Sequence, residues 1–165
     1  MSKKNARIII LIISLLLPYL KASASNDISF SHITGKDGLT SIPVTDILFD
    51  ENGMVWISTG GGLYNYYGNS AHEVNFSSPE SISRDILKLC TDRRGTLFGT
   101  GNNAVFALDL TTMEARILDD HGSRSMVYDE SLIVASYDGK LRRIQDDRTV
   151  IIASFPESVG ELSAV

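Results

Sequence analysis

The stretch from Val44 to Gly68 reads VTDILFDENGMVWISTGGGLYNYYG, and it decides the fold. It contains two apolar runs joined by a turn from Asp50 to Gly53, then a triple glycine and an aromatic run. The Asp50 carboxylate can accept hydrogen bonds from amides of the turn, and Gly53 can adopt the positive φ that closes it. Residues 54–59 are rich in β-branched and aromatic side chains, which favour a strand. The stretch therefore predicts an antiparallel β-meander with tight turns.

The same pattern recurs later in the chain. A shift of 42 residues aligns Asp50 with Asp92, Gly53 with Gly95, Trp56 with Phe98, and Leu63 with Val105. A third, weaker copy begins about 36 residues further on. It aligns Val134 with Phe98, Ser136 with Thr100, and Leu141 with Val105. A repeat of about 40 residues with four short strands is the signature of propeller blades.

The repeats predict an all-β fold, namely a β-propeller fragment of about three four-stranded antiparallel blades in an open arc. Within residues 25–165, we expect blades at about 44–76, 86–118 and 124–154, and the start of a further blade at 158–165. The turn at Asp138-Gly139 gives the strongest hairpin signal of the chain. An N-terminal strand is expected at 28–33.

The segment from Ser78 to Cys90 has two interpretations. Ser78 followed by Pro79, with apolar residues at helical spacing, would suit a short helix. The 42-residue register instead makes residues 86–90 a strand. We favour the strand because the same register accounts for Asp92 and Gly95, and a helical turn at 79–84 is compatible with it.

The first 24 residues resemble a secretory signal peptide. Three basic residues precede an apolar run from Ile8 to Leu20, and an A-x-A site ends at Ala24 before Ser25. The apolar run is shorter than the roughly 20 residues that a membrane-spanning helix needs. The sequence thus predicts cleavage between Ala24 and Ser25 and a periplasmic or secreted protein.

The charge of the mature chain excludes some partners. Without residues 1–24 the chain carries 11 basic and 20 acidic side chains. This balance argues against nucleic acid, which requires a basic surface, and it disfavours an anionic membrane. We expect membrane contact only through the signal peptide or through parts of a longer sensor. The single cysteine, Cys90, is expected to be a small buried apolar residue.

The repeat resembles the two-component regulator propeller repeat. The matching positions are Gly38-Leu39, Val44, Ile47, Asp50, Gly53, Trp56, Thr59, Gly62-Leu63 and Tyr67-Gly68. In that family the repeats form sensor propellers on the outer side of hybrid histidine kinases, many of which recognise oligosaccharides. The resemblance implies an exported ligand-sensing segment. The structural signature would comprise Asp50, Gly53, Trp56, Thr59, Gly62, Leu63, Asp92, Gly95, Phe98, Asp138 and Gly139.

Three blades are fewer than the four to eight that close a propeller. An open arc would expose apolar blade faces that need neighbours. We therefore expect a fragment of a longer sensor without its own kinase, whose partner is the remainder of that sensor. The alternative is an interaction module that closes its ring by self-association.

No motif predicts catalysis, a metal site or a cofactor. The glycines Gly60–Gly62 precede a strand and lack the lysine of a phosphate-binding loop, and the turn at Asp50 lacks the later ligands of a calcium loop. The histidines at 32, 72 and 121 have no metal-type spacing.

The run Asp119-Asp120-His121-Gly122-Ser123 places acid, imidazole and hydroxyl in sequence, but adjacency is not the geometry of a triad. The aromatic residues could stack on a sugar, yet strand alternation favours packing in the core: Trp56, Tyr64, Tyr66, Tyr67 and Phe98. We therefore expect a protein that is not an enzyme. A propeller lyase or glycosidase fragment is the weaker alternative.

Overall fold

The computed structural model describes residues 32–80, 82–146 and 148–155. Backbone contacts divide the chain into two units, Met1–His32 and Ile33–Val165, and the fold described below belongs to the second. The signal peptide, the cleavage site at Ala24 and Ser25, and the start of a further blade at 158–165 lie outside the described residues. So do residues 28–31 of the expected N-terminal strand, while His32 and Ile33 are not in a strand.

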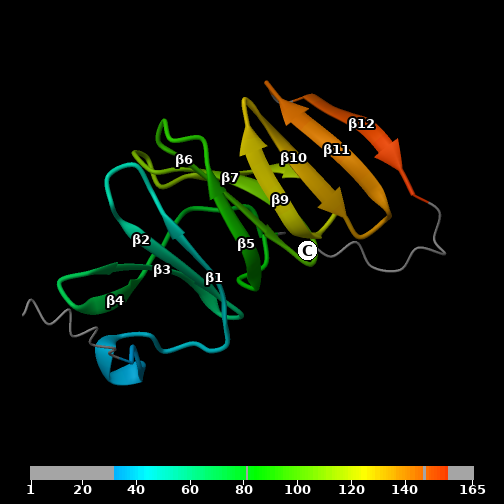
Figure 1. Cartoon of the computed structure of the whole chain (residues 1–165). Coiled ribbons are helices and arrows are strands. Elements are labelled where there is room, and N and C mark those ends of the chain that lie inside the picture. The colour runs from blue at the N-terminus through cyan, green and yellow to red at the C-terminus, as the bar shows by residue number, and fades with distance from the viewer. Residues whose placement is uncertain (1–31, 81, 147, 156–165) are drawn as a thin grey trace, which may run out of the picture. The chain divides into compact units, whose positions relative to one another are not determined.

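Three four-stranded antiparallel sheets account for the strands of the described segments (Figure 1). In each sheet the strands pair in chain order, as a meander does. The first sheet contains β1 (Val44–Phe49), β2 (Val55–Thr59), β3 (Gly62–Tyr67) and β4 (Ser70–Glu73). The second contains β5 (Ile86–Thr91), β6 (Thr96–Gly101), β7 (Val105–Asp109) and β8 (Ala115–Asp119). The third contains β9 (Ser123–Asp129), β10 (Ser131–Ser136), β11 (Lys140–Gln145) and β12 (Arg148–Ser154). The predicted all-β class is confirmed.

A 3-10 helix, η2 (Gly35–Asp37), precedes the first sheet. Among the residues that the structure describes, no helix is long and apolar enough to cross a membrane. The segment from Ser78 to Cys90 contains the strand β5 rather than a helix, and a turn precedes it in which the Ile82 amide donates to the Pro79 carbonyl over 3.0 Å.

Consecutive sheets pack face to face. We call the side of a sheet that contacts the next sheet along the chain its forward face, and the opposite side its backward face. Trp56 on the forward face of the first sheet packs with Leu97 and Phe106 on the backward face of the second. Phe98 on the forward face of the second packs with Leu132 and Val134 of the third. The core therefore lies between the sheets.

Polar side chains also join neighbouring sheets. The Thr45 hydroxyl donates to the Ile86 carbonyl, and the Asp46 carboxylate accepts the Leu89 amide over 2.9 Å. At the next junction the Thr100 hydroxyl donates to the Ser123 carbonyl over 3.1 Å. These bonds fix the inner strands β5 and β9 relative to the sheets before them.

The third copy follows a register other than the predicted one. In the second sheet Phe98 pairs with Ala107, and both residues pack forward. Its counterpart in the third sheet is Ile133, which pairs with Arg143, whereas Val134 packs backward against Phe98. The alignment of Val134 with Phe98 and of Ser136 with Thr100 was thus wrong by one residue. The cause is the β9–β10 turn, which is shorter than the turns at Asp50 and Asp92. The match of Leu141 with Val105 agrees with the observed pairing. Leu141 pairs with Ala135 and Val105 pairs with Thr100, and these two partners occupy equivalent positions of β10 and β6.

Candidate functional site

The repeat-signature aspartates lie in the turns between the first two strands of their sheets. Asp50 Oδ1 accepts the amides of Asn52 and Met54, each over 2.9 Å, and its Oδ2 accepts the indole N–H of Trp56 over 3.0 Å. Asp92 Oδ1 likewise accepts the amides of Arg94 and Thr96, over 2.8 and 3.0 Å. Gly53 and Gly95 close these turns with φ of 76° and 99°. These carboxylates therefore satisfy turn amides rather than facing a ligand.

The other signature residues lie within sheets or hairpins. Thr59, Gly62 and Leu63 are buried at the β2–β3 hairpin, where the Gly61 amide donates to the Thr59 hydroxyl over 3.1 Å. The triple glycine thus forms a strand-to-strand turn. In the third sheet, Asp138 and Gly139 form the β10–β11 turn, with Gly139 at a φ of 73°.

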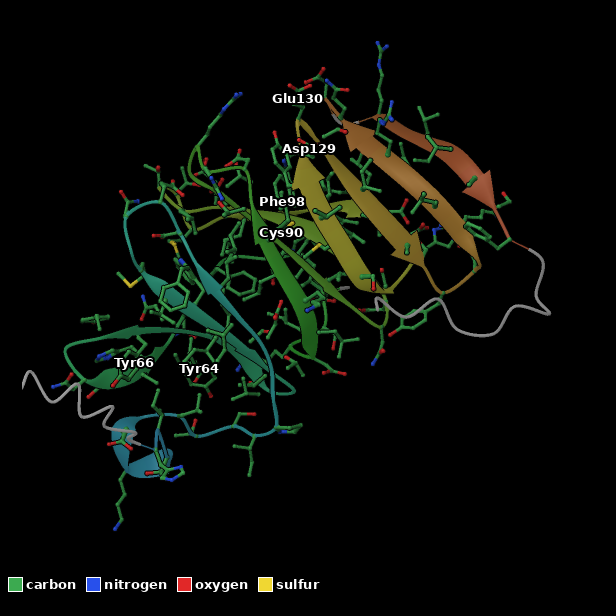
Figure 2. The ribbon with its side chains drawn as sticks, viewed as in Figure 1. Tyr64, Tyr66, Cys90, Phe98, Asp129 and Glu130 are labelled. Carbon is green, nitrogen blue, oxygen red and sulfur yellow. The ribbon has the colours of Figure 1, made fainter. Side chains whose placement is uncertain are left out.

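The aromatic residues considered for sugar stacking are divided between core and surface. Trp56, Tyr64 and Phe98 are buried, and Tyr64 lies beside Tyr66 on β3 (Figure 2). Tyr67 is exposed, and its ring stacks on His72 with centroids 4.0 Å apart. The structure does not bring these five rings together into one platform.

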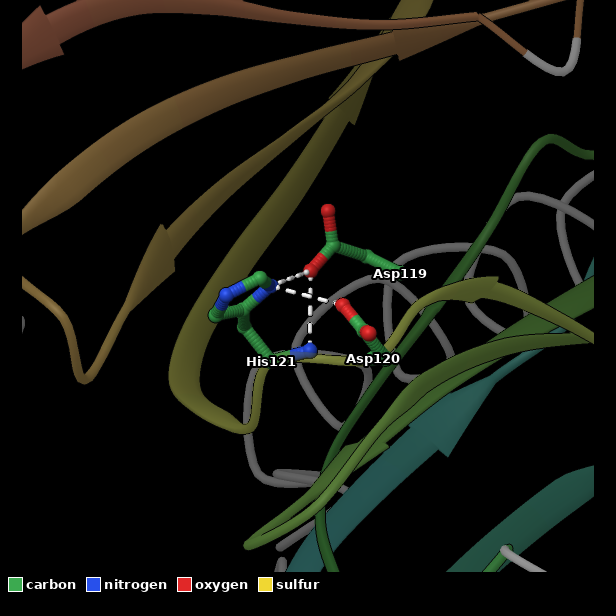
Figure 3. A group of neighbouring side chains, drawn as sticks. All are labelled: Asp119, Asp120 and His121. Carbon is green, nitrogen blue, oxygen red and sulfur yellow. Dashed lines mark hydrogen bonds and ion pairs between the residues drawn. The ribbon is translucent and has the colours of Figure 1, made fainter.

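The run Asp119-Asp120-His121 forms a compact polar cluster at the link between the second and third sheets (Figure 3). His121 Nδ1 lies 2.8 Å from Asp119 Oδ1 and 2.9 Å from Asp120 Oδ1. The Ser123 hydroxyl instead lies within hydrogen-bond distance of the backbone carbonyls of Ser125 and Ala135, to either of which it can donate. Acid, imidazole and hydroxyl are adjacent in sequence but do not form a catalytic triad.

A buried arginine pairs with one carboxylate of this cluster and with Asp138. Arg142 on β11 forms two bonds of 2.7 Å to the Asp138 carboxylate, and its Nε lies 3.4 Å from Asp119 Oδ2. The Arg142 side chain is only 4% exposed and that of Asp119 7%. The hydrogen bonds from Arg142 hold the pKa of Asp138 well below its usual value, and they raise the pKa of Arg142. Because Asp119 and Asp138 already have a cationic partner, the arrangement fits a clasp between two sheets better than a metal centre.

Sequence reasoning did not identify Arg142. Arg142 pairs with Val134 and therefore faces the second sheet, where an arginine is unusual. The sequence could indicate this only if the register of the third copy had been predicted correctly.

Two adjoining hollows lie at the turns that contain Arg94 and Glu130, and both are lined by Tyr128 and Glu130. Their cavity volumes are about 450 and 470 Å³. We call them together the turn groove. Figure 2 shows Asp129 and Glu130 at the β9–β10 turn and Phe98 beside Cys90 on the second sheet.

The turn groove has two aromatic residues at its base and mainly polar side chains around them. In its interior, the ring of Phe98 stacks on that of Tyr128 with centroids 5.4 Å apart and planes 12° apart. At its rim lie the exposed side chains of Arg94, Glu130 and Asp146. Sequence reasoning missed this groove because its residues come from turns that are far apart in the chain.

Cys90 also lines the turn groove. Burial, together with the charges of Asp46 and Asp92, raises the pKa of this thiol to about 12. A thiol with such a pKa is not a nucleophile at neutral pH.

Comparisons with known proteins support the predicted repeat. Residues 38–61 match the family model described as Two component regulator propeller, which confirms the resemblance. No curated protein matches the chain.

Solved structures show the same fold. The extracellular domain of BT4673 from B. thetaiotaomicron, described as a hybrid two component system, is 17% identical with a TM-score of 0.64 over 79% of this chain and 19% of that one. The extracellular domain of BT3049 from the same organism, described likewise, is 16% identical with a TM-score of 0.55 over 70% of this chain and 19% of that one. The N-terminal domain of Nup159 is 22% identical with a TM-score of 0.50 over 73% of this chain and 33% of that one. At these identities the likeness shows the fold alone. This chain spans about a fifth of the length of these two extracellular domains.

Proposed function

We propose that this chain is a ligand-sensing propeller segment of an exported sensor that resembles those of hybrid two component systems. The observation that carries the proposal is the two component regulator propeller repeat at residues 38–61. The similar extracellular domains of BT4673 and BT3049 support an extracellular or periplasmic location. The chain would bind its ligand without transforming it, and the kinase would belong to another part of the sensor.

We further propose the turn groove as the binding site and an oligosaccharide as the ligand. The partly exposed side chains of Leu118 and Tyr128, which line the groove, offer an apolar surface for a sugar ring. The guanidinium of Arg94 and the carboxylate of Glu130 at the rim offer donors and acceptors for hydroxyl groups. The polar cluster around Arg142 is less suitable, because its charged groups already bond one another.

Calorimetric titration of the purified chain with a panel of oligosaccharides tests this proposal. Arg94→Ala and Glu130→Ala should each weaken the binding of an active glycan about tenfold, the effect of about 1.4 kcal/mol from one lost hydrogen bond to a charged group. Glu51→Ala, at an equivalent turn outside the groove, is the matched control and should leave binding unchanged. Equal affinity in all variants would exclude the groove as the site. Release of reducing ends from the glycan would instead show an enzyme.

A further inference from the structure

Two adjacent arginines lie at the turn groove. Arg93 and Arg94 belong to the β5–β6 turn, and both residues are exposed. Arg94 lines one hollow of the groove and Arg93 lines the other. Among the residues that the structure describes, neither guanidinium has an ion-pair partner. Other basic side chains do have carboxylate partners: Arg84, Lys88, Lys140 and Arg142.

The fold of the turn does not require these arginines. The 42-residue repeat aligns Arg93 with Glu51 and Arg94 with Asn52 of the β1–β2 turn. The two turns are built alike, because in each the first aspartate accepts two turn amides through one carboxylate oxygen. A glutamate and an asparagine therefore serve the same turn as well as two arginines do.

Arg93 also has a left-handed backbone conformation. Its φ is 57°, which is unfavourable for a residue other than glycine, asparagine or aspartate. Two residues of the third sheet that line the groove, Glu130 and Asp146, have φ of 56° and 48°. Three of the five described residues other than glycine with a positive φ thus line this groove. Such conformations cluster at ligand sites, where they are retained for function at a cost in stability.

The charges of the groove are separated between its two walls. The wall from the second sheet carries Arg93 and Arg94, and side-chain oxygens within the β5–β6 turn accept their backbone amides over 3.0 and 2.8 Å. The wall from the third sheet carries the carboxylates of Glu130 and Asp146. A ligand in the groove therefore meets cations on one side and anions on the other.

We infer that Arg93 and Arg94 bind an anionic group of the ligand, so that the glycan of the turn groove is acidic and carries carboxylate or sulfate groups. This inference rests on the function proposed above for the groove. The planar guanidinium forms paired hydrogen bonds with a carboxylate and with other oxyanions. The carboxylates of the opposite wall would accept hydrogen bonds from hydroxyl groups of the same glycan. Because the mature chain has 11 basic and 20 acidic side chains, its overall charge repels anions, and an acidic ligand needs a local cationic site.

Calorimetric titration of the purified chain with three tetrasaccharides tests this inference. The probes are neutral galactotetraose, tetragalacturonate with its carboxylates, and a sulfated galactotetraose. We expect at least one acidic probe to bind more than about tenfold more tightly than the neutral one in about 50 mM NaCl, and this advantage to shrink in about 300 mM NaCl. The double variant Arg93→Gln/Arg94→Gln should lose the advantage, because glutamine retains donors but not the charge.

Two further variants separate the site from other effects of charge and turn structure. Arg143→Gln/Arg148→Gln is the matched control, because these two exposed arginines line a different hollow, on the third sheet. It removes the same charge and should leave the advantage of the acidic probe unchanged. Arg93→Gly should weaken binding of the acidic probe and yet unfold at an equal or higher urea concentration, because glycine adopts the left-handed conformation without strain.

The failure of this inference can be distinguished from the failure of the proposed function. If the neutral probe binds as tightly as both acidic ones and Arg94→Ala weakens it, the groove remains the binding site and the acidic ligand is excluded. If no glycan, acidic or neutral, binds the wild-type chain, the proposed function fails and this inference fails with it. An acidic advantage that survives Arg93→Gln/Arg94→Gln, or that Arg143→Gln/Arg148→Gln abolishes equally, would also overturn the inference.

Discussion

Replacing Arg142 by methionine should destabilise the protein by about 3 kcal/mol. Methionine retains the unbranched apolar stem of the arginine side chain but lacks the cation that faces Asp119 and Asp138. Breaking a buried ion pair from one side costs roughly 3–5 kcal/mol. We take the lower end because the Asp138 side chain is 26% exposed and Asp119 keeps its contacts with His121.

Urea unfolding at pH 7, followed by circular dichroism, measures this loss. Arg84→Met is the matched control, because Arg84 pairs with Glu73 at the surface, where an ion pair contributes about 0–1 kcal/mol. Removing the charge of Asp119 as well, in Arg142→Met/Asp119→Asn, should recover part of the lost stability. A loss from Arg142→Met no larger than that from Arg84→Met would refute the role of Arg142 as a clasp.

Three further outcomes follow from contacts described above. The lowered pKa of Asp138 means that its contribution to stability is complete above the unfolded-state pKa of about 3.9 and is lost as the pH falls below it; Asp138→Asn should therefore reduce the difference in unfolding free energy between pH 7 and pH 3. Asp50→Ala removes the acceptor of two turn amides and of the Trp56 indole and should cost about 1–3 kcal/mol in urea unfolding, whereas Glu51→Ala in the same turn should change stability by less than about 0.5 kcal/mol. The Cys90 thiol, with a pKa of about 12, should react with a disulfide reagent at pH 8 far more slowly in the folded protein than after unfolding, and equally rapid reaction in both states would contradict the raised pKa.

The first two sheets could be predicted from the sequence because their local signals agree. The turn at Asp50-Gly53, the β-branched residues after it and the repeat at 42 residues all indicate the same strands. The observed strand β1 begins at Val44, where the first blade was predicted to begin, and β2 begins at Val55, one residue later than the predicted strand at 54–59. Strand assignment at 86–90 likewise followed from the repeat, against a plausible helical pattern.

The third sheet could be predicted only in outline. Its inner strand β9 follows β5 by 37 residues in the sequence, because Met126 is the counterpart of Leu89. Its second strand β10 follows β6 by only 35 residues, because Leu132 is the counterpart of Leu97. A constant shift therefore places β10 one residue out of register, which exchanges its two faces. Because of this error, the sequence could not indicate that Arg142 faces the second sheet or that Ile133 lies on the forward face. The turn groove could not be predicted, because it depends on how turns from different sheets meet in space.

The packing of sheets only against their neighbours has a consequence for how the chain opens. β5 contacts β1 and β2 on one side and β9 on the other, so the middle sheet is enclosed, while the first and third sheets each have one side that no other described sheet contacts. Local opening should then proceed inward from the two outer sheets, and amide protons of β6 and β7 should exchange with solvent more slowly than those of β3 or β11. The order of exchange along the chain would thus record the order of the sheets in space.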